Sequence, residues 1–219
     1  MRILSTSAGL TSNRMENDRS VSHMLDSDAA KLRSMLRELD HRVRNTLAAI
    51  QSLVEMQLAA EDYTRDGLLV LSGRIQAMAR AHELLAVTPR AGVDLEDAIE
   101  VILRPWAPED SVILQGEQVR ISPETALPMC LLINELATNA VKHGSLAAAG
   151  GSLSIDWSNQ DGFVTLNWIE TGGLSCSEPD QANGAGLGLI RGFAEHQMHG
   201  TCKFDWHADG LRVHLQFKQ

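Results

Sequence analysis

The sequence predicts an α+β protein in which an N-terminal two-helix hairpin precedes a two-layer α/β sandwich. Three observations support this fold class. Residues 28–88 contain two long runs with the apolar spacing of amphipathic helices. Pro89 and Gly92 then mark a linker. Residues 92–219 mix helical runs with strands of alternating polarity, whereas residues 1–27, rich in Ser, Thr, Asn and Asp, are expected to be flexible.

The hairpin is expected to contain helices at about residues 28–60 and 64–86. Thr64 is a suitable N-cap for the second helix, and Pro89 closes it. The first apolar stripe is Leu32, Leu36, Leu39, Val43, Leu47, Ile50 and Val54, and the second is Leu68, Leu71, Ile75, Met78, His82 and Leu85. Because His82 is in phase with the second stripe, we interpret it as a packing residue.

A single hairpin leaves apolar surface uncovered even when its two stripes pack together. Leu58, Leu69 and Leu84 lie on its flanks. A second copy, forming a four-helix bundle, or a neighbouring domain would cover them. Because two-fold pairs are the commonest oligomers, we predict a homodimer formed through residues 28–87.

His41 lies in the stretch LDHRVRNTLAAIQSL, residues 39–53. At about 100° per residue, it is roughly opposite the apolar positions Leu39 and Val43, so its imidazole faces solvent, with Asn45 one turn away. A lone histidine on a helix surface is most often a solvated polar residue. The motifs of the second domain favour a chemical role for His41 instead.

The helices of the second domain carry recognisable start and stop signals. Asp94 can cap a short helix. Ser122 and Pro123 are an N-cap followed by proline at the first helical position, and they open a long helix that ends at Gly144. Pro128 lies within the early turns of this helix, so a later start remains open.

Short strands fit residues 112–114 and 118–121, and four longer strands follow the long helix. The strand residues predicted to face inward are Leu153, Ile155, Trp157, Val164, Leu166, Trp168, Cys202, Phe204, Trp206, Leu211, Val213, Leu215 and Phe217. A turn at residues 207–210 joins the last two strands. This alternation predicts an antiparallel sheet with helices on one face and solvent on the other.

Glu135, Asn139 and Lys142 form a polar strip on the otherwise apolar long helix, within about 60° of one another. Such a strip needs a polar ligand to satisfy it. The amide oxygen of Asn139 suits Mg²⁺, and Lys142 can contact phosphate. The alternative is an internal salt bridge between Glu135 and a neighbouring lysine.

Glu170 continues the inward-facing series of its strand, so its carboxylate is expected on the apolar side of the sheet. Gly172 and Gly173 follow and allow a flat ligand to approach the backbone. A carboxylate in an apolar slot can accept hydrogen bonds from an exocyclic amine such as that of adenine. The alternative is that the strand has ended and Glu170 turns to water.

The glycine-rich stretch 183–189 is expected to open a helix from Leu189 to His199. Exposed N–H groups and the helix dipole make such a start a phosphate cradle. No parallel βαβ unit surrounds it, so it is not a dinucleotide-binding fingerprint. Most isolated glycine-rich loops are only turns.

Composition excludes several classes of function. The net charge of −9 disfavours a nucleic-acid partner. No apolar run approaches the roughly 20 residues of a membrane span. Cys130, Cys176 and Cys202 have no metal-binding or disulfide spacing, so we expect a reducing, cytoplasmic setting.

Together and in this order, the motifs resemble the HWE and related HisKA_2 groups of bacterial sensor histidine kinases, whose ATP-binding domain has the GHKL (Bergerat) fold. In this chain, LDHRVRNTLAAIQSL resembles the family's H-box. The stretch RIQAMARAHELLA resembles the second helix of the family's dimerisation domain. The stretch NELATNAVKHG resembles the family's N-box. WIETGG resembles its first glycine box, and NGAGLGL resembles its second. The resemblance covers about residues 28–217.

The resemblance implies an ATP-dependent protein-histidine kinase that uses Mg²⁺ and passes a phosphoryl group from His41 to an aspartate of a response-regulator receiver domain. Its implied catalytic residues are His41, Glu135 and Asn45. Its implied nucleotide-binding residues are Asn139, Lys142, His143, Trp168, Glu170, Gly172, Gly173, Gly184, Gly186, Leu187 and Gly188, with Asn139 also the metal ligand. We recognise no sensor domain ahead of the hairpin, so a separate sensor or regulatory protein is a further expected partner.

Two positions depart from the family pattern. Asn134 replaces the histidine that names the N-box of the HWE group, and Arg42 stands where the largest kinase class has an acid. The neighbouring Asp40 points about 100° away from His41 around the helix. The base that deprotonates His41 therefore stays open.

Two other functions are compatible with parts of the sequence. One is a histidine phosphotransfer adaptor whose nucleotide domain no longer binds ATP, which the intact Asn139, Glu170 and glycine boxes argue against. The other is a GHKL-type ATPase or serine kinase with Glu135 as the base, which leaves the H-box unexplained.

Overall fold

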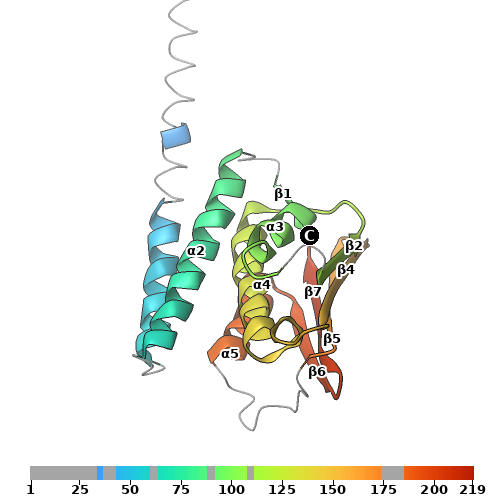
Figure 1. Ribbon diagram of the computed structural model, residues 1–219. Helices are drawn as coiled ribbons and strands as arrows, with labels where there is room; N and C mark the ends of the chain where they lie inside the picture. The colour runs from blue at the N-terminus through green and yellow to red at the C-terminus, as the bar shows by residue number, and fades with distance from the viewer. Residues whose placement is uncertain (1–33, 37–42, 60–63, 88–91, 108–110, 174–184) are drawn as a thin grey trace, which may run out of the picture. The chain divides into compact units, whose positions relative to one another are not determined.

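The computed structural model describes residues 34–36, 43–59, 64–87, 92–107, 111–173 and 185–219 (Figure 1). The chain divides into two compact units, Met1–Glu55 and Met56–Gln219. The expected flexible segment and linker lie largely outside the described residues. So do Leu32, Leu39, Asp40, His41, Arg42, Cys176 and Gly184. The expected domain boundary at residues 88–92 stays a prediction.

Residues 43–59 are helical, as expected for the later part of the first helix. Its predicted apolar stripe is largely exposed in the single chain: Val43 is 50% exposed and Leu47 60% exposed. An apolar stripe of this kind is covered when a helix meets a partner.

The second helix of the hairpin, α2 (Arg65–Val87), begins where the sequence predicted. Thr64 caps it, because its Oγ1 accepts a hydrogen bond from the Gly67 N–H at 3.1 Å. Its buried face includes Arg74, Ala77, Met78, Ala81 and Leu85.

Leu68, predicted in the buried stripe of α2, is instead 57% exposed. α2 packs on the outer side of α4 (Pro123–His143), away from the sheet (Figure 1). Small side chains such as Ala77 face this contact and allow close approach. Leu68 lies about 180° around the helix from Ala77, which explains its exposure.

The start of the second domain follows its capping signals. A short antiparallel pair joins β1 (Val93–Asp94) to β3 (Arg120–Ile121). Asp94 caps α3 (Leu95–Leu103) by accepting a hydrogen bond from the Glu96 N–H at 3.2 Å.

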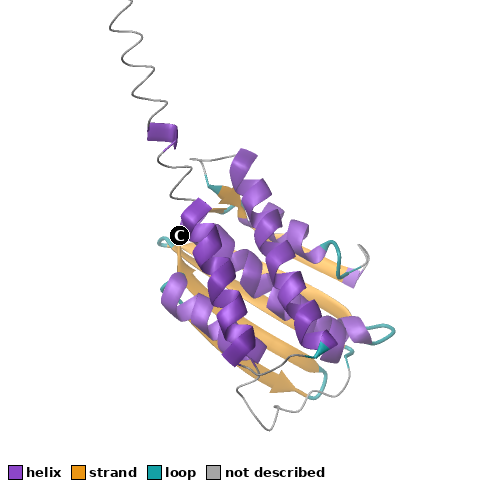
Figure 2. Ribbon diagram, turned by 90° about the vertical axis from the view of Figure 1, so that its left-hand side faces the viewer, coloured by secondary structure: helices purple, strands orange, loops and turns teal. Residues whose placement is uncertain are grey.

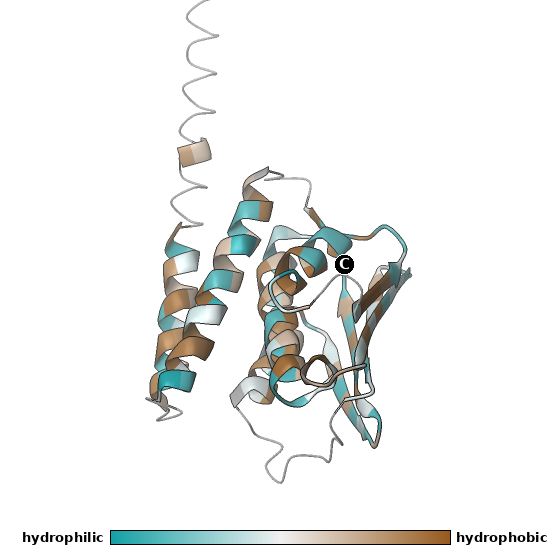
Figure 3. Cartoon of the chain, in the orientation of Figure 1, coloured by the Kyte–Doolittle hydropathy of each residue, from teal (hydrophilic) through white to brown (hydrophobic). Residues whose placement is uncertain are grey.

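The long helix α4 starts at Pro123, because the Ser122 hydroxyl accepts a hydrogen bond from the Thr125 N–H at 3.3 Å. Pro128 therefore lies inside the helix, and a later start is wrong. The helix ends at His143, immediately before the predicted terminator Gly144. Apolar residues dominate the ribbon of α4 (Figure 3), which is buried along most of its length.

The main sheet has five strands in the order β2-β4-β5-β7-β6. Their bounds are β2 Val112–Gly116, β4 Ser152–Gln160, β5 Phe163–Thr171, β6 Thr201–His207 and β7 Gly210–Lys218. The expectation of a wholly antiparallel sheet is wrong at one edge, where β2 pairs parallel with β4. The segment between these strands contains α4, the kind of helical crossover that a parallel pair needs.

Helices cover one face of the sheet (Figure 2). α3, α4 and α5 (Ala185–Gly192) belong to this layer, which a single-turn π-helix at Phe193–Gln197 extends. The predicted inward residues of β4, β5 and β7 are buried. Phe204 and Trp206 are only half-buried, because β6 is an edge strand. Within the described residues, no helix is long and apolar enough to cross a membrane.

Candidate functional site

Glu170, near the end of β5, points into the protein as predicted and is 1% exposed. Its Oε2 accepts a hydrogen bond from the Ser145 N–H at 2.8 Å, and its Oε1 accepts one from the Trp168 indole N–H at 2.9 Å. The alternative that Glu170 turns to water is therefore wrong. Burial raises the pKa of Glu170, and the hydrogen bonds from Trp168 and Ser145 partly oppose that rise.

Two glycines allow α4 and β5 to meet at Glu170. A Cβ on Gly144 would collide with Glu170 Oε2, and one on Gly173 would lie 2.9 Å from the Ser145 backbone nitrogen. Gly172 has φ +71°, a left-handed conformation that glycine adopts without strain. Gly172 and Gly173 thus lie close to the C-terminal end of α4, and their own backbone is not covered by side chains.

Trp168 is completely buried. Its observed polar contact is the hydrogen bond to Glu170, so it orients the carboxylate from within the core. Trp168 therefore supports Glu170 through this hydrogen bond, and its predicted contact with a nucleotide stays a prediction.

Glu135 forms a bidentate ion pair with Arg74 of α2. Arg74 Nε donates to Oε1 at 2.8 Å, and Arg74 Nη2 donates to Oε2 at 2.7 Å. The side chains of Arg74 and Glu135 are 4% and 5% exposed. An internal salt bridge is thus what the structure contains, with an arginine of another helix in place of the lysine considered from sequence.

The N-terminal turn of α5 lies against the polar strip of α4. A Cβ on Gly186 would lie 3.3 Å from Glu135 Oε2, and 3.8 Å from both the oxygen and the nitrogen of the Asn139 amide. Asn139 is half-buried, whereas Lys142 and His143 are exposed near the end of α4. The structure therefore brings Glu135, Asn139 and Gly186 together.

The predicted start of this helix at Leu189 is wrong, because α5 already begins at Ala185. Gly186 and Gly188 belong to its first turn, Leu187 is buried, and no atom lies within 4 Å of a Cβ on Gly188. The backbone N–H groups of a first helical turn lack intrahelical partners and favour anions. Gly186, Leu187 and Gly188 therefore lie at the helix start, whereas Gly184 is outside the described residues and the phosphate cradle stays a prediction.

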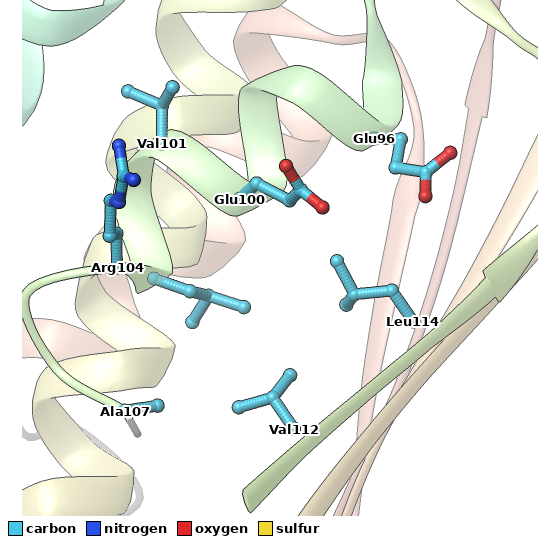
Figure 4. Close-up of a pocket in the computed structure, with 8 residues that line it drawn as sticks. Glu96, Glu100, Val101, Arg104, Ala107, Val112 and Leu114 are labelled. Carbon is cyan, nitrogen blue, oxygen red and sulfur yellow. The ribbon is translucent and has the colours of Figure 1, made fainter. Parts of the chain in front are cut away.

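A separate cavity of about 480 Å³ lies between α3 and the edge strand β2 (Figure 4). Its lining includes Glu96, Glu100 and Arg104 of the α3 region and Val112 and Leu114 of β2. None of the predicted site residues lines it, so it is not part of the site at the end of α4.

Comparison with known proteins identifies the family. Residues 38–118 match the family model described as HWE histidine kinase. A blue-light-activated histidine kinase of Rhizobium johnstonii is 32% identical over 186 residues, which cover 83% of this chain and 52% of that protein. Blue-light-activated histidine kinase 1 of Erythrobacter litoralis is 30% identical, over 84% of this chain and 52% of its own length. Residues 38–118 thus form an HWE histidine kinase domain. It spans about half the length of these relatives.

Solved structures support the fold of this chain. The Erythrobacter litoralis EL346 blue-light activated histidine kinase matches with a TM-score of 0.67 at 18% identity, over 83% of this chain and 60% of that one. Its histidine kinase domain matches with a TM-score of 0.56 at 16% identity, over 80% of this chain and 94% of that one. The α+β fold with a two-layer α/β sandwich is therefore confirmed.

The HWE chain has a donor set that fits Mg²⁺. The Asn139 amide is a hard oxygen ligand and lies beside the first turn of α5. Mg²⁺ is usually held by one or two protein ligands together with waters and substrate phosphates.

Sequence reasoning missed two residues of this HWE site, Arg74 and Ser145. Arg74 precedes Met78 by four residues, so the two lie on the same face of α2. A charged residue on a face predicted to be buried could have indicated a buried ion pair. Ser145 carried no signal, because its contribution is a backbone N–H.

Proposed function

We propose that this chain is an ATP-dependent protein-histidine kinase that phosphorylates itself on His41 and passes the phosphoryl group to an aspartate of a response-regulator receiver domain. The main observation behind the proposal is that the Asn139 side chain lies beside Gly186, in the first turn of α5. It occurs in a chain whose family match, residues 38–118, includes His41. The names of the curated relatives, which are histidine kinases, support the same activity.

The nucleotide would lie along the C-terminal half of α4. Each oxygen of Glu170 accepts one hydrogen bond, so a further lone pair remains to accept the adenine amine. Gly172 and Gly173 allow the ring to approach the backbone. The N–H groups of Gly186, Leu187 and Gly188 would receive the phosphates.

Asn139, Lys142 and His143 would act at the phosphate end. Asn139 would hold Mg²⁺, which neutralises phosphate charge when bound. The exposed Lys142 would attract the phosphates as a point charge, with His143 next to it. Gly184 completes the proposed cradle.

In the proposed reaction, an imidazole nitrogen of His41 attacks the γ-phosphorus of ATP. An N–P bond forms, the bond from the γ-phosphorus to the bridging oxygen breaks, and ADP leaves with that electron pair. The displaced imidazole proton passes to a base, for which Glu135 is the candidate, with Asn45 one turn from His41 as a polar partner. Catalysis of this kind depends mainly on positioning and charge neutralisation.

We also propose that the chain works as a homodimer through residues 28–87. Exposed Val43, Leu47, Leu58 and Leu69 support this, because apolar side chains at helical spacing need a covering partner. Cys130 and Cys202 are free and buried, which suits a reducing cytoplasm. A response regulator and a separate sensor or regulatory protein are the other proposed partners.

Incubation with radiolabelled ATP and Mg²⁺ tests the kinase proposal. We expect His41→Gln to lose acid-labile, base-stable label while ATP affinity stays within about twofold, a difference below 0.5 kcal/mol. His196→Gln, which changes an exposed histidine of the second domain, should retain the label. Label that persists in His41→Gln would refute the assignment, and phosphate release without phosphoprotein would indicate an ATPase. Phosphotransfer to a panel of receiver domains would identify the partner.

A further inference from the structure

The ion pair of Arg74 and Glu135 connects two helices to which the proposed function gives different tasks. Arg74 is on α2, the second helix of the expected phosphoacceptor hairpin, and Glu135 is on α4 of the ATP-binding domain. Both charges are almost completely removed from water, and both Glu135 oxygens are engaged. The guanidinium occupies one acceptor site on each oxygen, so a substrate or water would have the whole carboxylate only after the guanidinium moves away.

The pair lies directly beside the expected phosphate site. Glu135 Oε2, which accepts from Arg74, is the atom 3.3 Å from a Cβ on Gly186, at the first turn of α5. A guanidinium binds phosphate with the same bidentate geometry as carboxylate. Phosphates arriving at this turn would therefore compete with Glu135 for Arg74.

Both helices also carry buried polar atoms that lack a hydrogen-bond partner. Within the described residues, Arg80 Nε on α2 and Asn134 Oδ1 on α4 are buried and have no hydrogen-bond partner. Trp106 Nε1 is likewise unpartnered, and its ring lies 4.0 Å from a Cβ on Gly73 of α2. Buried unpaired polar atoms cost free energy, so this contact is better suited to reversible docking than to permanent closure.

A buried ion pair contributes little net stability, because desolvation offsets its Coulomb attraction, but it can fix one register between two elements. We propose that Arg74 is a latch: its pairing with Glu135 holds α2 on α4 in a resting state, and phosphorylation of His41 requires the pair to open. The latch rests on the proposed kinase function. It assigns Arg74 a regulatory positioning role and makes Glu135 available only in the open state.

The full chain with Arg74→Gln tests the latch, and Arg65→Gln, at an exposed arginine of the same helix, is the matched control. We expect Arg74→Gln to speed amide hydrogen exchange in α2 and to raise the initial rate of autophosphorylation about fivefold or more, the lower range of allosteric coupling. Arg74→Lys keeps the positive charge but loses the two-pronged guanidinium contact with Glu135. It should therefore give exchange and autophosphorylation rates between those of wild type and Arg74→Gln. Arg65→Gln should behave as wild type in both measurements.

Glu135→Gln breaks the pair from the other side, so its α2 exchange should match that of Arg74→Gln whatever its activity. This variant decides the question if Arg74→Gln does not fold. Wild-type exchange in either folded variant, or slower autophosphorylation in folded Arg74→Gln, would overturn the latch. If wild type itself incorporates no phosphate on His41, the kinase proposal fails, and the exchange data still decide whether Arg74 holds α2 on α4.

Discussion

Trp168 donates its indole N–H to the carboxylate of Glu170, two residues further along β5, at 2.9 Å. Alternation along a strand places residues i and i+2 on one face, so this pairing follows from the strand geometry. Both side chains are buried in the structure, Trp168 completely and Glu170 at 1% exposure. It therefore fixes the orientation of the one buried carboxylate proposed to recognise adenine.

Trp168→Phe tests the charge on that carboxylate. The variant keeps an aromatic ring but loses the donor, and a hydrogen bond to a charged group contributes about 1.5–3 kcal/mol to the free energy of unfolding. Trp157→Phe is a matched control, because Trp157 donates to the neutral backbone oxygen of Glu117 at 2.8 Å, which is worth about 0.5–1.5 kcal/mol. Urea unfolding at a pH above the raised pKa of Glu170 measures both. Equal losses would show that Glu170 is not ionised.

Glu170→Gln tests the direction of the pKa shift. Burial raises the pKa of Glu170, so over the range between its ordinary and its raised pKa the folded state binds more protons than the unfolded state. The stabilising contribution of Glu170 should therefore be greatest below its ordinary pKa of about 4.5 and fall as the pH rises through the raised value. The Tm difference, wild type minus Glu170→Gln, should decrease with rising pH in thermal melts. An increase would mean that the folded pKa is lowered.

Asn139→Ala should remove the Mg²⁺ dependence of ATP binding, because Asn139 is the proposed amide ligand at the first turn of α5. Isothermal titration with ATP, with and without Mg²⁺, measures the effect. Gln160→Ala removes an exposed amide at the end of β4 and should bind as wild type. ATP binding by Asn139→Ala that keeps its full Mg²⁺ dependence would contradict this role.

Gly144→Ala should destabilise the protein and displace Glu170, because the added methyl group would collide with Glu170 Oε2. Overpacking of this kind costs about 1–3 kcal/mol. Gly192→Ala, where no atom lies within 4 Å of the added Cβ, is the control and should not lose stability. Denaturant unfolding compares the two, and equal stability would show that α4 and β5 can separate without cost.

Leu47→Glu and Leu69→Glu should each convert the proposed dimer to a monomer, because a charge would replace an exposed apolar side chain of the hairpin. Light scattering should give about twice the chain mass of 23.9 kDa for wild type. Ile113→Glu, at an exposed apolar residue of β2, should leave the dimer intact. A wild-type mass near 24 kDa, unchanged on removal of the first 25 residues, would refute the dimer.

The sequence by itself determined the features that depend on local chemistry. Thr64, Asp94 and Ser122 begin helices where predicted, because a cap needs only its own side chain and the next few N–H groups. The inward direction of Glu170 follows from strand alternation and was predicted correctly. The motifs also led to the HWE family, which the comparisons confirm.

Only the tertiary structure decided features that depend on which element lies beside which. Hydropathy placed Leu68 in the interior, but α2 turns Arg74 and Ala77 toward α4 instead. The parallel pairing of β2 with β4 depends on a crossover through α4, which alternation along one strand cannot reveal. Arg74 and Glu135 are 61 residues apart in the chain. Their pairing could not be predicted from the sequence, because it depends on how α2 packs against α4.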